Sequence, residues 1–235
     1  MEHKEHFHGS DLEKIEKIYG IKKEELVSFS ANVNPLGLSE LVKTELSKQL
    51  DCLTAYPDRE YTGLRKAIGS YVNSSFENVL VGNGASELIS LLAKVIKPKK
   101  ALILGPTYSE YEHSIGLAGG NSDYFELKET DNFVLNKESL LAHLNKDYDL
   151  CVLCNPNNPT SALIEKGVLE EVVACANKNN VLMLVDETYM EFVADVDASS
   201  AISLVSKYSN LVVLRGVSKF FASPGLRLGY AVTSN

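Results

Sequence analysis

Residues 212–230 read VVLRGVSKFFASPGLRLGY, and the rest of the chain is arranged around them. An apolar run, typical of a buried strand, leads to Lys219 in a turn rich in small residues, and a second apolar run follows Arg227. We therefore expect Lys219 at a strand end, where partial desolvation favours the neutral amine that attacks a carbonyl. Arg227 offers a planar cation suited to a phosphate. Because most lysines are solvated, a reactive role needs support from the rest of the chain.

The length and composition of the chain limit its domain number, its binding partners and its location. Its 235 residues can hold one large domain or two small ones, with a sizeable core. The formal charge of −8 comes from 31 acidic against 23 basic residues, which argues against nucleic acid and anionic membranes. The longest apolar runs are strand-sized and the N-terminus has no hydrophobic signal core, so a cytoplasmic protein is predicted.

The four cysteines show no spacing typical of a secreted disulfide framework. Cys151 and Cys154 form a C-x-x-C pair within an apparent strand, where residues three apart face opposite sides. No second pair exists to complete a zinc site, so no metal site is predicted.

Strand and helix patterns alternate along the chain. Strands are predicted at 79–81, 101–104, 124–127, 150–153, 182–185, 211–214 and 228–232, and helices at 12–19, 40–50, 64–72, 86–96, 108–117, 137–144, 165–177 and 198–207. This alternation predicts an α/β fold, a three-layer α/β/α architecture with a mostly parallel seven-stranded sheet. We expect residues 1–45 to form an N-terminal arm and helix, and residues 46–235 to form one large domain.

Ligands of such sheets bind beyond the carboxyl ends of the strands. After one predicted strand, residues 82–87 read GNGASE, a glycine-rich turn that opens a helix and suits a phosphate. Residues 154–160 read CNPNNPT, a proline-stiffened loop with three amides, and residues 186–189 read DETY, a carboxylate beside a phenol. The fourth such segment is Ser218-Lys219.

The motifs of dinucleotide-binding proteins, ATPases and serine hydrolases are missing from these segments. The glycine-rich turn is not a dinucleotide fingerprint, because Glu87 stands where the third glycine belongs. A strand that ends in Asp-Glu also occurs in ATPases, but the chain has no G-x-x-x-x-G-K-[ST] loop, and it has no G-x-S-x-G of a hydrolase.

Together these residues form the set that pyridoxal 5'-phosphate (PLP) needs: a Schiff-base lysine, an acid partner for the pyridine nitrogen, and phosphate anchors. On these motifs the chain resembles fold-type-I PLP enzymes of the class I/II aminotransferase superfamily. The resemblance is to the branch of histidinol-phosphate aminotransferase and threonine-phosphate decarboxylase, and it covers nearly the whole sequence.

The resemblance implies a role for each matching residue. Lys219 matches the lysine that forms the internal aldimine and moves a proton, and Asp186 matches the carboxylate that keeps the pyridine nitrogen protonated. Tyr189 and Asn158 match the pair that hydrogen-bonds the ring 3′-oxygen, and Tyr108 matches the aromatic stacked on the ring. The cofactor-phosphate ligands correspond to Ala85, Ser86, Ser218 and Arg227.

The resemblance also implies contacts beyond the cofactor of one subunit. Tyr56 matches a residue that reaches the phosphate of the neighbouring subunit's cofactor, which implies a homodimer with shared sites. The turn at Asn34, Leu36 and Gly37 is expected to line the substrate side.

The chain departs from the family pattern in three places. Ser161 stands where a glycine usually follows Asn-Pro-Thr, and Gly216 stands where a hydroxyl residue often helps to bind phosphate; both are expected to loosen the cradle slightly. The sequence stops at Asn235, whereas family members continue into a C-terminal small domain that supplies an arginine for the substrate carboxylate. We therefore expect a fragment or a truncated product that lacks this domain.

The resemblance favours a PLP-dependent aminotransferase that acts on a small phosphorylated amino acid or amine, with a 2-oxo acid as acceptor. The alternative is a PLP-dependent decarboxylase similar to threonine-phosphate decarboxylase, and a third reading is PLP binding without turnover. A DNA-binding regulator of this superfamily would carry a basic helix pair, which this acidic chain lacks.

Overall fold

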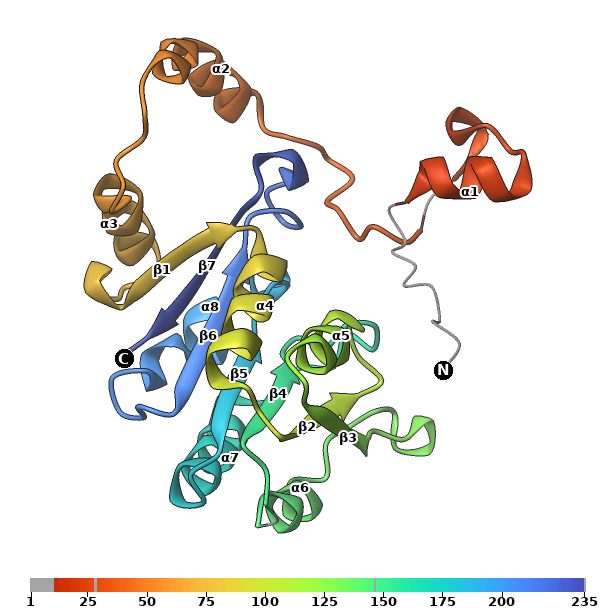
Figure 1. Ribbon diagram of the computed structural model, residues 1–235, viewed down its shortest axis with the longest axis vertical. Coiled ribbons are helices and arrows are strands. Elements are labelled where there is room, and N and C mark those ends of the chain that lie inside the picture. The colour runs from red at the N-terminus through yellow and green to blue at the C-terminus, as the bar shows by residue number, and fades with distance from the viewer. Residues whose placement is uncertain (1–10, 28, 146, 235) are drawn as a thin grey trace.

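Seven strands form one sheet in the computed structural model, which describes residues 11–27, 29–145 and 147–234 (Figure 1). The strands are β1 Val79–Asn83, β2 Lys100–Gly105, β3 Asn121–Glu126, β4 Leu150–Cys154, β5 Leu182–Asp186, β6 Leu211–Gly216 and β7 Leu228–Thr233. Their spatial order is β1-β7-β6-β5-β4-β2-β3. All run in one direction except β7, which is antiparallel to both β1 and β6. The predicted α/β fold with a mostly parallel seven-stranded sheet is confirmed.

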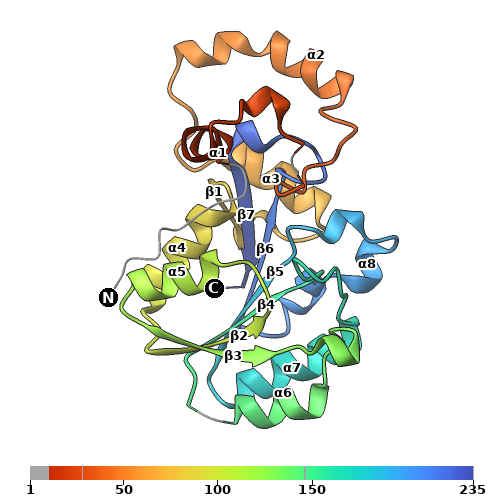
Figure 2. The same ribbon diagram turned by 90° about the vertical axis from the view of Figure 1, so that its right-hand side faces the viewer.

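The described residues also form helices, several of which cover the two faces of this sheet. They are α1 Leu12–Tyr19, α2 Glu40–Lys48, α3 Thr62–Tyr71, α4 Ala85–Ile96, α5 Glu110–Leu117, α6 Lys137–Leu144, α7 Lys166–Lys178 and α8 Val196–Ser199. Ile89 of α4 and Ile115 of α5 pack into one core, and Leu140 of α6 and Val173 of α7 pack into another. Figure 2 shows α4 and α5 together on one side of the sheet and α8 on the other.

The alternation of side chains along each strand separates the two cores. In β4 every residue is buried, with Val152 in the core under α4 and α5 and Leu153 in the core under α6 and α7. Cys151 and Cys154 fall into different cores, as the sequence predicts for residues three apart in a strand. Among the described residues, no group of three His, Cys, Asp or Glu side chains could hold a metal ion.

The predicted helix 198–207 is wrong, because the chain breaks at Ser200. There α8 ends, and a 3-10 turn follows at Ala201–Leu204. Ser200 adopts an extended geometry, its hydroxyl accepts a hydrogen bond from Ile202 N, and that hydroxyl also donates to Glu187 at 2.8 Å. A contact with a distant strand end therefore overrides the local helical pattern.

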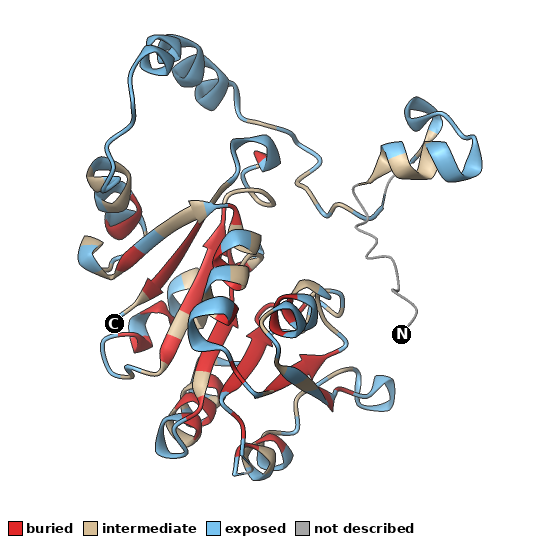
Figure 3. Cartoon of the chain, in the orientation of Figure 1, coloured by how far each residue is buried: buried red, intermediate tan, exposed pale blue. Residues whose placement is uncertain are grey.

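Residues 39–61 are exposed throughout and lie away from the sheet (Figure 3). They include α2 and carry Leu41, Leu50, Leu53 and Tyr56, of which Tyr56 is fully exposed. The predicted arm of residues 1–45 lies partly outside the described residues, and its division from a large domain stays a prediction. None of the described helices has the length and apolar character that a membrane span requires.

Candidate active site

The carboxyl ends of the parallel strands bring the predicted residues to one edge of the sheet. The register aligns Cys154 of β4 with Asp186 of β5, and Asp186 with Leu214 of β6. Because β7 is antiparallel, it begins at this same edge, with Gly229 opposite Gly216. The loop between β6 and β7 therefore presents both Lys219 and Arg227 where the other strands end.

Lys219 is half-buried in this loop, and an N-terminal segment lies against it. Its Nζ donates a hydrogen bond of 2.5 Å to the carbonyl oxygen of Ala31. Asn34 N donates to the Lys219 carbonyl at 3.0 Å, and Asn34 Nδ2 donates to the Phe220 carbonyl at 2.9 Å. Burial lowers the pKa of Lys219, which favours its neutral amine. Thus the predicted lysine has the environment that a nucleophilic amine needs.

The turn after Asn34 presents the predicted substrate side. Asn34 Oδ1 accepts a hydrogen bond of 3.0 Å from Leu36 N, and Gly37 has a φ of 74°, which favours glycine. Leu36 and Gly37 are both exposed. Asn34 is therefore fixed against the lysine loop, whereas Leu36 and Gly37 are exposed to solvent.

Asp186 is a buried carboxylate with donors on both oxygens. Its Oδ1 accepts hydrogen bonds from Thr188 N at 2.9 Å and Thr188 Oγ1 at 2.6 Å, and its Oδ2 accepts one from Tyr111 Oη at 2.7 Å. Burial raises the pKa of Asp186, and these hydrogen bonds act in the opposite direction. Sequence reasoning missed Tyr111, although its position three residues after Tyr108 was a signal.

Tyr108 stands beside Tyr111 and above the start of α4. The two rings meet edge to face with centroids 5.7 Å apart. Burial raises the pKa of the Tyr108 hydroxyl, and a hydrogen bond with Ser86 lowers it. Through this bond the predicted ring-stacking residue is joined to the predicted phosphate site.

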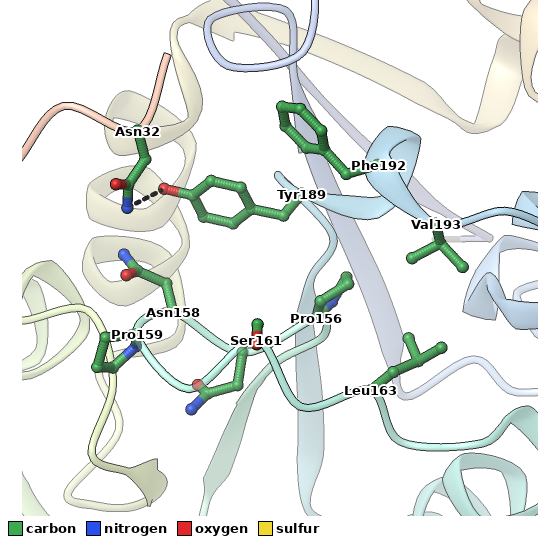
Figure 4. A pocket seen from close by; sticks show the side chains of 10 residues that line it. Asn32, Pro156, Asn158, Pro159, Ser161, Leu163, Tyr189, Phe192 and Val193 are labelled. Carbon is green, nitrogen blue, oxygen red and sulfur yellow. Dashed lines mark hydrogen bonds between the residues drawn. The ribbon is translucent and has the colours of Figure 1, made fainter. Parts of the chain in front are cut away.

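A pocket of about 420 Å³ opens beside Tyr189 (Figure 4). Asn32 Nδ2 donates to Tyr189 Oη at 3.5 Å, and Asn158 lies next to this pair on the pocket wall. Asn32 has a φ of 50° and was not predicted as a site residue; its sequence signal is its place two residues before Asn34. The pocket is also lined by Pro156, Asn157, Pro159, Ser161, Leu163, Phe192 and Val193.

The beginning of α4 forms a cradle in which a side chain at Gly84 or Gly229 would collide with its neighbours. A Cβ on Gly84 would lie 2.5 Å from Arg227 Nη2, and a Cβ on Gly229 would lie 2.4 Å from Ala85 N. Arg227 Nη2 also donates to the Asn83 carbonyl at 3.4 Å. The guanidinium thus lies beside Gly84, the residue before a twelve-residue helix, and the first turn of a helix favours a phosphate through both charge and hydrogen bonding.

Two further predicted site residues are Ser218 and Tyr56. Ser218 precedes Lys219 on the same loop and is half-buried. Tyr56 is fully exposed on the segment between α2 and α3, and the structure does not bring it to the other residues. The other residues nevertheless fit the three groups of PLP. Arg227 and the α4 terminus suit a phosphate, Asp186 suits a protonated ring nitrogen, and Lys219 suits an aldehyde.

The family model described as "Aminotransferase class I and II" matches residues 24–235. The chain belongs to this family. The class I and II aminotransferase family consists of PLP-dependent enzymes. The predicted resemblance is confirmed.

Relatives and a solved structure agree with the assignment to class I and II aminotransferases. The chain is 34% identical over 228 residues to the threonine-phosphate decarboxylase of Salmonella typhimurium, covering 97% of this chain and 62% of that protein. It is 35% identical over 214 residues to the histidinol-phosphate aminotransferase of Clostridium novyi, covering 89% and 58%. The crystal structure of the histidinol-phosphate aminotransferase from Clostridium acetobutylicum superposes with a TM-score of 0.81 at 33% identity, covering 89% and 61%. The chain thus spans about three fifths of the length of these relatives.

Proposed function

We propose that this edge of the sheet binds PLP and that the protein is an aminotransferase for a small phosphorylated amino acid or amine, with a 2-oxo acid as acceptor. The observation that carries the proposal is Lys219, a lysine with a lowered pKa on the same loop as the arginine of a phosphate cradle. When bound, PLP supplies an electron sink for the substrate. The similarity to the Clostridium novyi histidinol-phosphate aminotransferase supports this substrate class.

Each residue has a proposed part in this chemistry. Arg227 and the N–H groups of Ala85 and Ser86 bind the phosphate. Asp186 holds a proton at the ring nitrogen by presenting a buried carboxylate. Lys219 Nζ carries the covalent attachment and moves a proton at the reacting carbon.

The remaining parts concern the ring and its surroundings. Tyr189 and Asn158 are proposed to donate hydrogen bonds to the ring 3′-oxygen, Tyr108 to cover the ring face, and Ser218 to add a hydroxyl to the phosphate. The turn at 34–37 is proposed to face the substrate.

The test is covalent trapping. PLP is added to the chain, the visible absorption is recorded, borohydride is added, and the modified peptide is mapped by mass spectrometry. We expect the label on Lys219, in preference to Lys207, a largely exposed lysine bound to Glu170. Label spread evenly over surface lysines would contradict the cofactor site.

The second candidate function is decarboxylation of an amino-acid phosphate, favoured by the 34% identity to the Salmonella typhimurium threonine-phosphate decarboxylase. Histidinol phosphate with 2-oxoglutarate, or threonine phosphate alone, distinguishes the two when each is added to the PLP-loaded protein. Production of glutamate supports transamination, and release of carbon dioxide supports decarboxylation. A loaded protein that does neither would be a PLP binder without turnover.

A homodimer and a cytoplasmic location are also proposed. The apolar side chains of the exposed segment 39–61 support the dimer, because such a surface is unusual on a monomer. Tyr56 of this segment would then reach the partner's phosphate cradle. Sedimentation of wild type and of a Leu50→Asp, Leu53→Asp variant tests the dimer: the variant should sediment as a monomer, and an unchanged profile would contradict it.

A further inference from the structure

Behind the candidate site lies a buried cluster of charges centred on Arg215 of β6. Arg215 Nε and Nη2 donate to Glu187 Oε2 at 3.0 and 2.8 Å, and Nη1 donates to Glu191 Oε1 at 3.1 Å. Arg215 is 3% exposed and Glu187 is fully buried. The third donor to Glu187 Oε2 is the hydroxyl of Ser200, at 2.8 Å, and Ala201 N donates to Oε1 of Glu187 at 2.6 Å.

The cluster joins two segments that carry the candidate catalytic side chains. Glu187 follows Asp186 directly, and Glu191 comes two residues after Tyr189. Arg215 is the penultimate residue of β6 and is four residues before Lys219, in the loop that follows. One guanidinium therefore connects the 186–191 turn to the lysine loop.

The cluster lies on the sheet face opposite the cofactor side of β6. Leu214 belongs to the core under α4 and α5, so Arg215, the next residue along the strand, faces the other way. There Arg215 is paired across the ladder with Tyr230 of β7. None of these charges touches the cradle, so the cluster has no direct chemical part in the site.

The hydrogen bonds of Arg215 hold Glu187 and Glu191 at fixed positions relative to β6. Guanidinium donors lie in one rigid plane, and charges removed from water hold their partners only if the geometry is good. A lysine at this position would offer one nitrogen on a flexible stem and could not bond both glutamates in the same fork. The two glutamates outnumber their single cation, and burial raises the pKa of both carboxyl groups.

We propose that Arg215 is a positioning residue that sets the place of Lys219 relative to Asp186 and Tyr189. The inference rests on the proposed function, because these three side chains matter together only around a cofactor ring. It predicts that the reactivity of Lys219 depends on a side chain that does not touch it.

The experiment compares the wild-type chain with Arg215→Lys and with a triple variant, Arg215→Met, Glu187→Gln, Glu191→Gln, which removes the charges but keeps the volumes. The control is Val213→Ala on the same strand, a fully buried residue outside the cluster. Thermal unfolding measures how far each substitution lowers the melting temperature, and the variants are compared at temperatures equally far below their own melting temperatures. Two readouts follow: acetic anhydride labelling of Lys219 against pH without cofactor, with Lys207 as reference, and the yield of PLP trapped on Lys219 by borohydride.

We expect both cluster variants to shift the labelling profile of Lys219 by about half a pH unit or more and to lower the trapped yield about tenfold. When the proteins are compared equally far below their melting temperatures, Val213→Ala should change neither the labelling profile nor the trapped yield. The proposal is overturned if both cluster variants unfold earlier but keep the wild-type labelling profile. If PLP never attaches to the wild-type chain while the profile still shifts in the cluster variants, the proposed function fails and the positioning of Lys219 by Arg215 stands.

Discussion

The hydroxyl of Tyr111 donates a hydrogen bond of 2.7 Å to Oδ2 of Asp186, and both side chains are buried. This bond lowers the pKa of a carboxyl group that burial raises. Tyr111 therefore favours the ionised Asp186 that a protonated ring nitrogen requires.

Replacing Tyr111 by phenylalanine should weaken PLP binding about tenfold, because the loss of this donor disfavours the ionised Asp186 by about 1–3 kcal/mol and so disfavours a proton on the ring nitrogen. The dissociation constant is measured by titrating the visible absorbance of PLP. Tyr208→Phe is the matched control, since Tyr208 donates to Glu170, a surface carboxylate. Equal affinity in Tyr111→Phe and Tyr208→Phe would show that the buried bond has no influence on the cofactor.

Ser161 has a φ of 56°, a left-handed conformation that favours glycine, the residue that the resemblance leads us to expect at this position. Left-handed geometry costs a non-glycine residue about 1–2 kcal/mol, and glycine loses about 0.5–1 kcal/mol through its more flexible unfolded chain. Ser161→Gly should therefore raise the free energy of unfolding by roughly 0.5 kcal/mol, measured by urea denaturation. Ser109→Gly, at a φ of −69°, should instead destabilise the chain. A less stable Ser161→Gly protein would contradict this account.

Gly216 has room for a side chain beside the phosphate cradle. A Cβ there would meet Leu228 O at 3.8 Å and Ala85 Cβ at 3.9 Å, both ordinary contacts. Gly216→Ser should supply the hydroxyl that the resemblance leads us to expect here and tighten PLP binding up to about tenfold, at about 1 kcal/mol for a new hydrogen bond. Gly229→Ser is the opposite case, since its Cβ would lie 2.4 Å from Ala85 N, and it should abolish binding. Titration with PLP measures both, and weaker binding by Gly216→Ser would refute the prediction.

The lowered pKa of Lys219 gives a pH dependence of stability with a definite sign. Its ordinary value is 10.5, and burial lowers it, so the contribution of Lys219 to folding is fully present above pH 10.5 and is lost as pH falls through the folded value. Relative to wild type, Lys219→Met should therefore gain stability as pH falls from 10.5 to 7. The gain should be less than about 1 kcal/mol, because water reaches part of the side chain.

Lys207→Met is the control with the opposite sign. The hydrogen bond to Glu170 raises the pKa of Lys207, so the contribution of this lysine is present below pH 10.5 and is lost only above it. Urea denaturation from pH 7 to 10.5 measures both differences. A Lys219→Met difference that does not change with pH would contradict the effect of burial.

Most of the strands could be predicted from the sequence because they are short apolar runs, as in β4, where every residue is buried. The first half of β3, residues 121–123, was not predicted because it is polar and not buried. The edge at which Lys219, Asp186 and the α4 cradle meet followed from that prediction. The break at Ser200 could not, because it depends on Glu187, a residue whose proximity only the folded chain creates. Tyr111 and Asn32 were missed for the same reason: each matters through one contact with a residue more than seventy positions away, at Asp186 and Tyr189.

The reversed direction of β7 has a mechanical consequence. Residues 217–227 leave the sheet at β6 and return to it at the neighbouring strand, so both ends of the loop are anchored at one edge. A parallel seventh strand would have required a crossover of a dozen or more residues between the amine and its arginine. Because both ends of the loop are held by the sheet, the length of the loop limits the distance between the Lys219 amine and Arg227. One added residue would leave the sheet intact and yet spoil the fit to a cofactor whose own length cannot change.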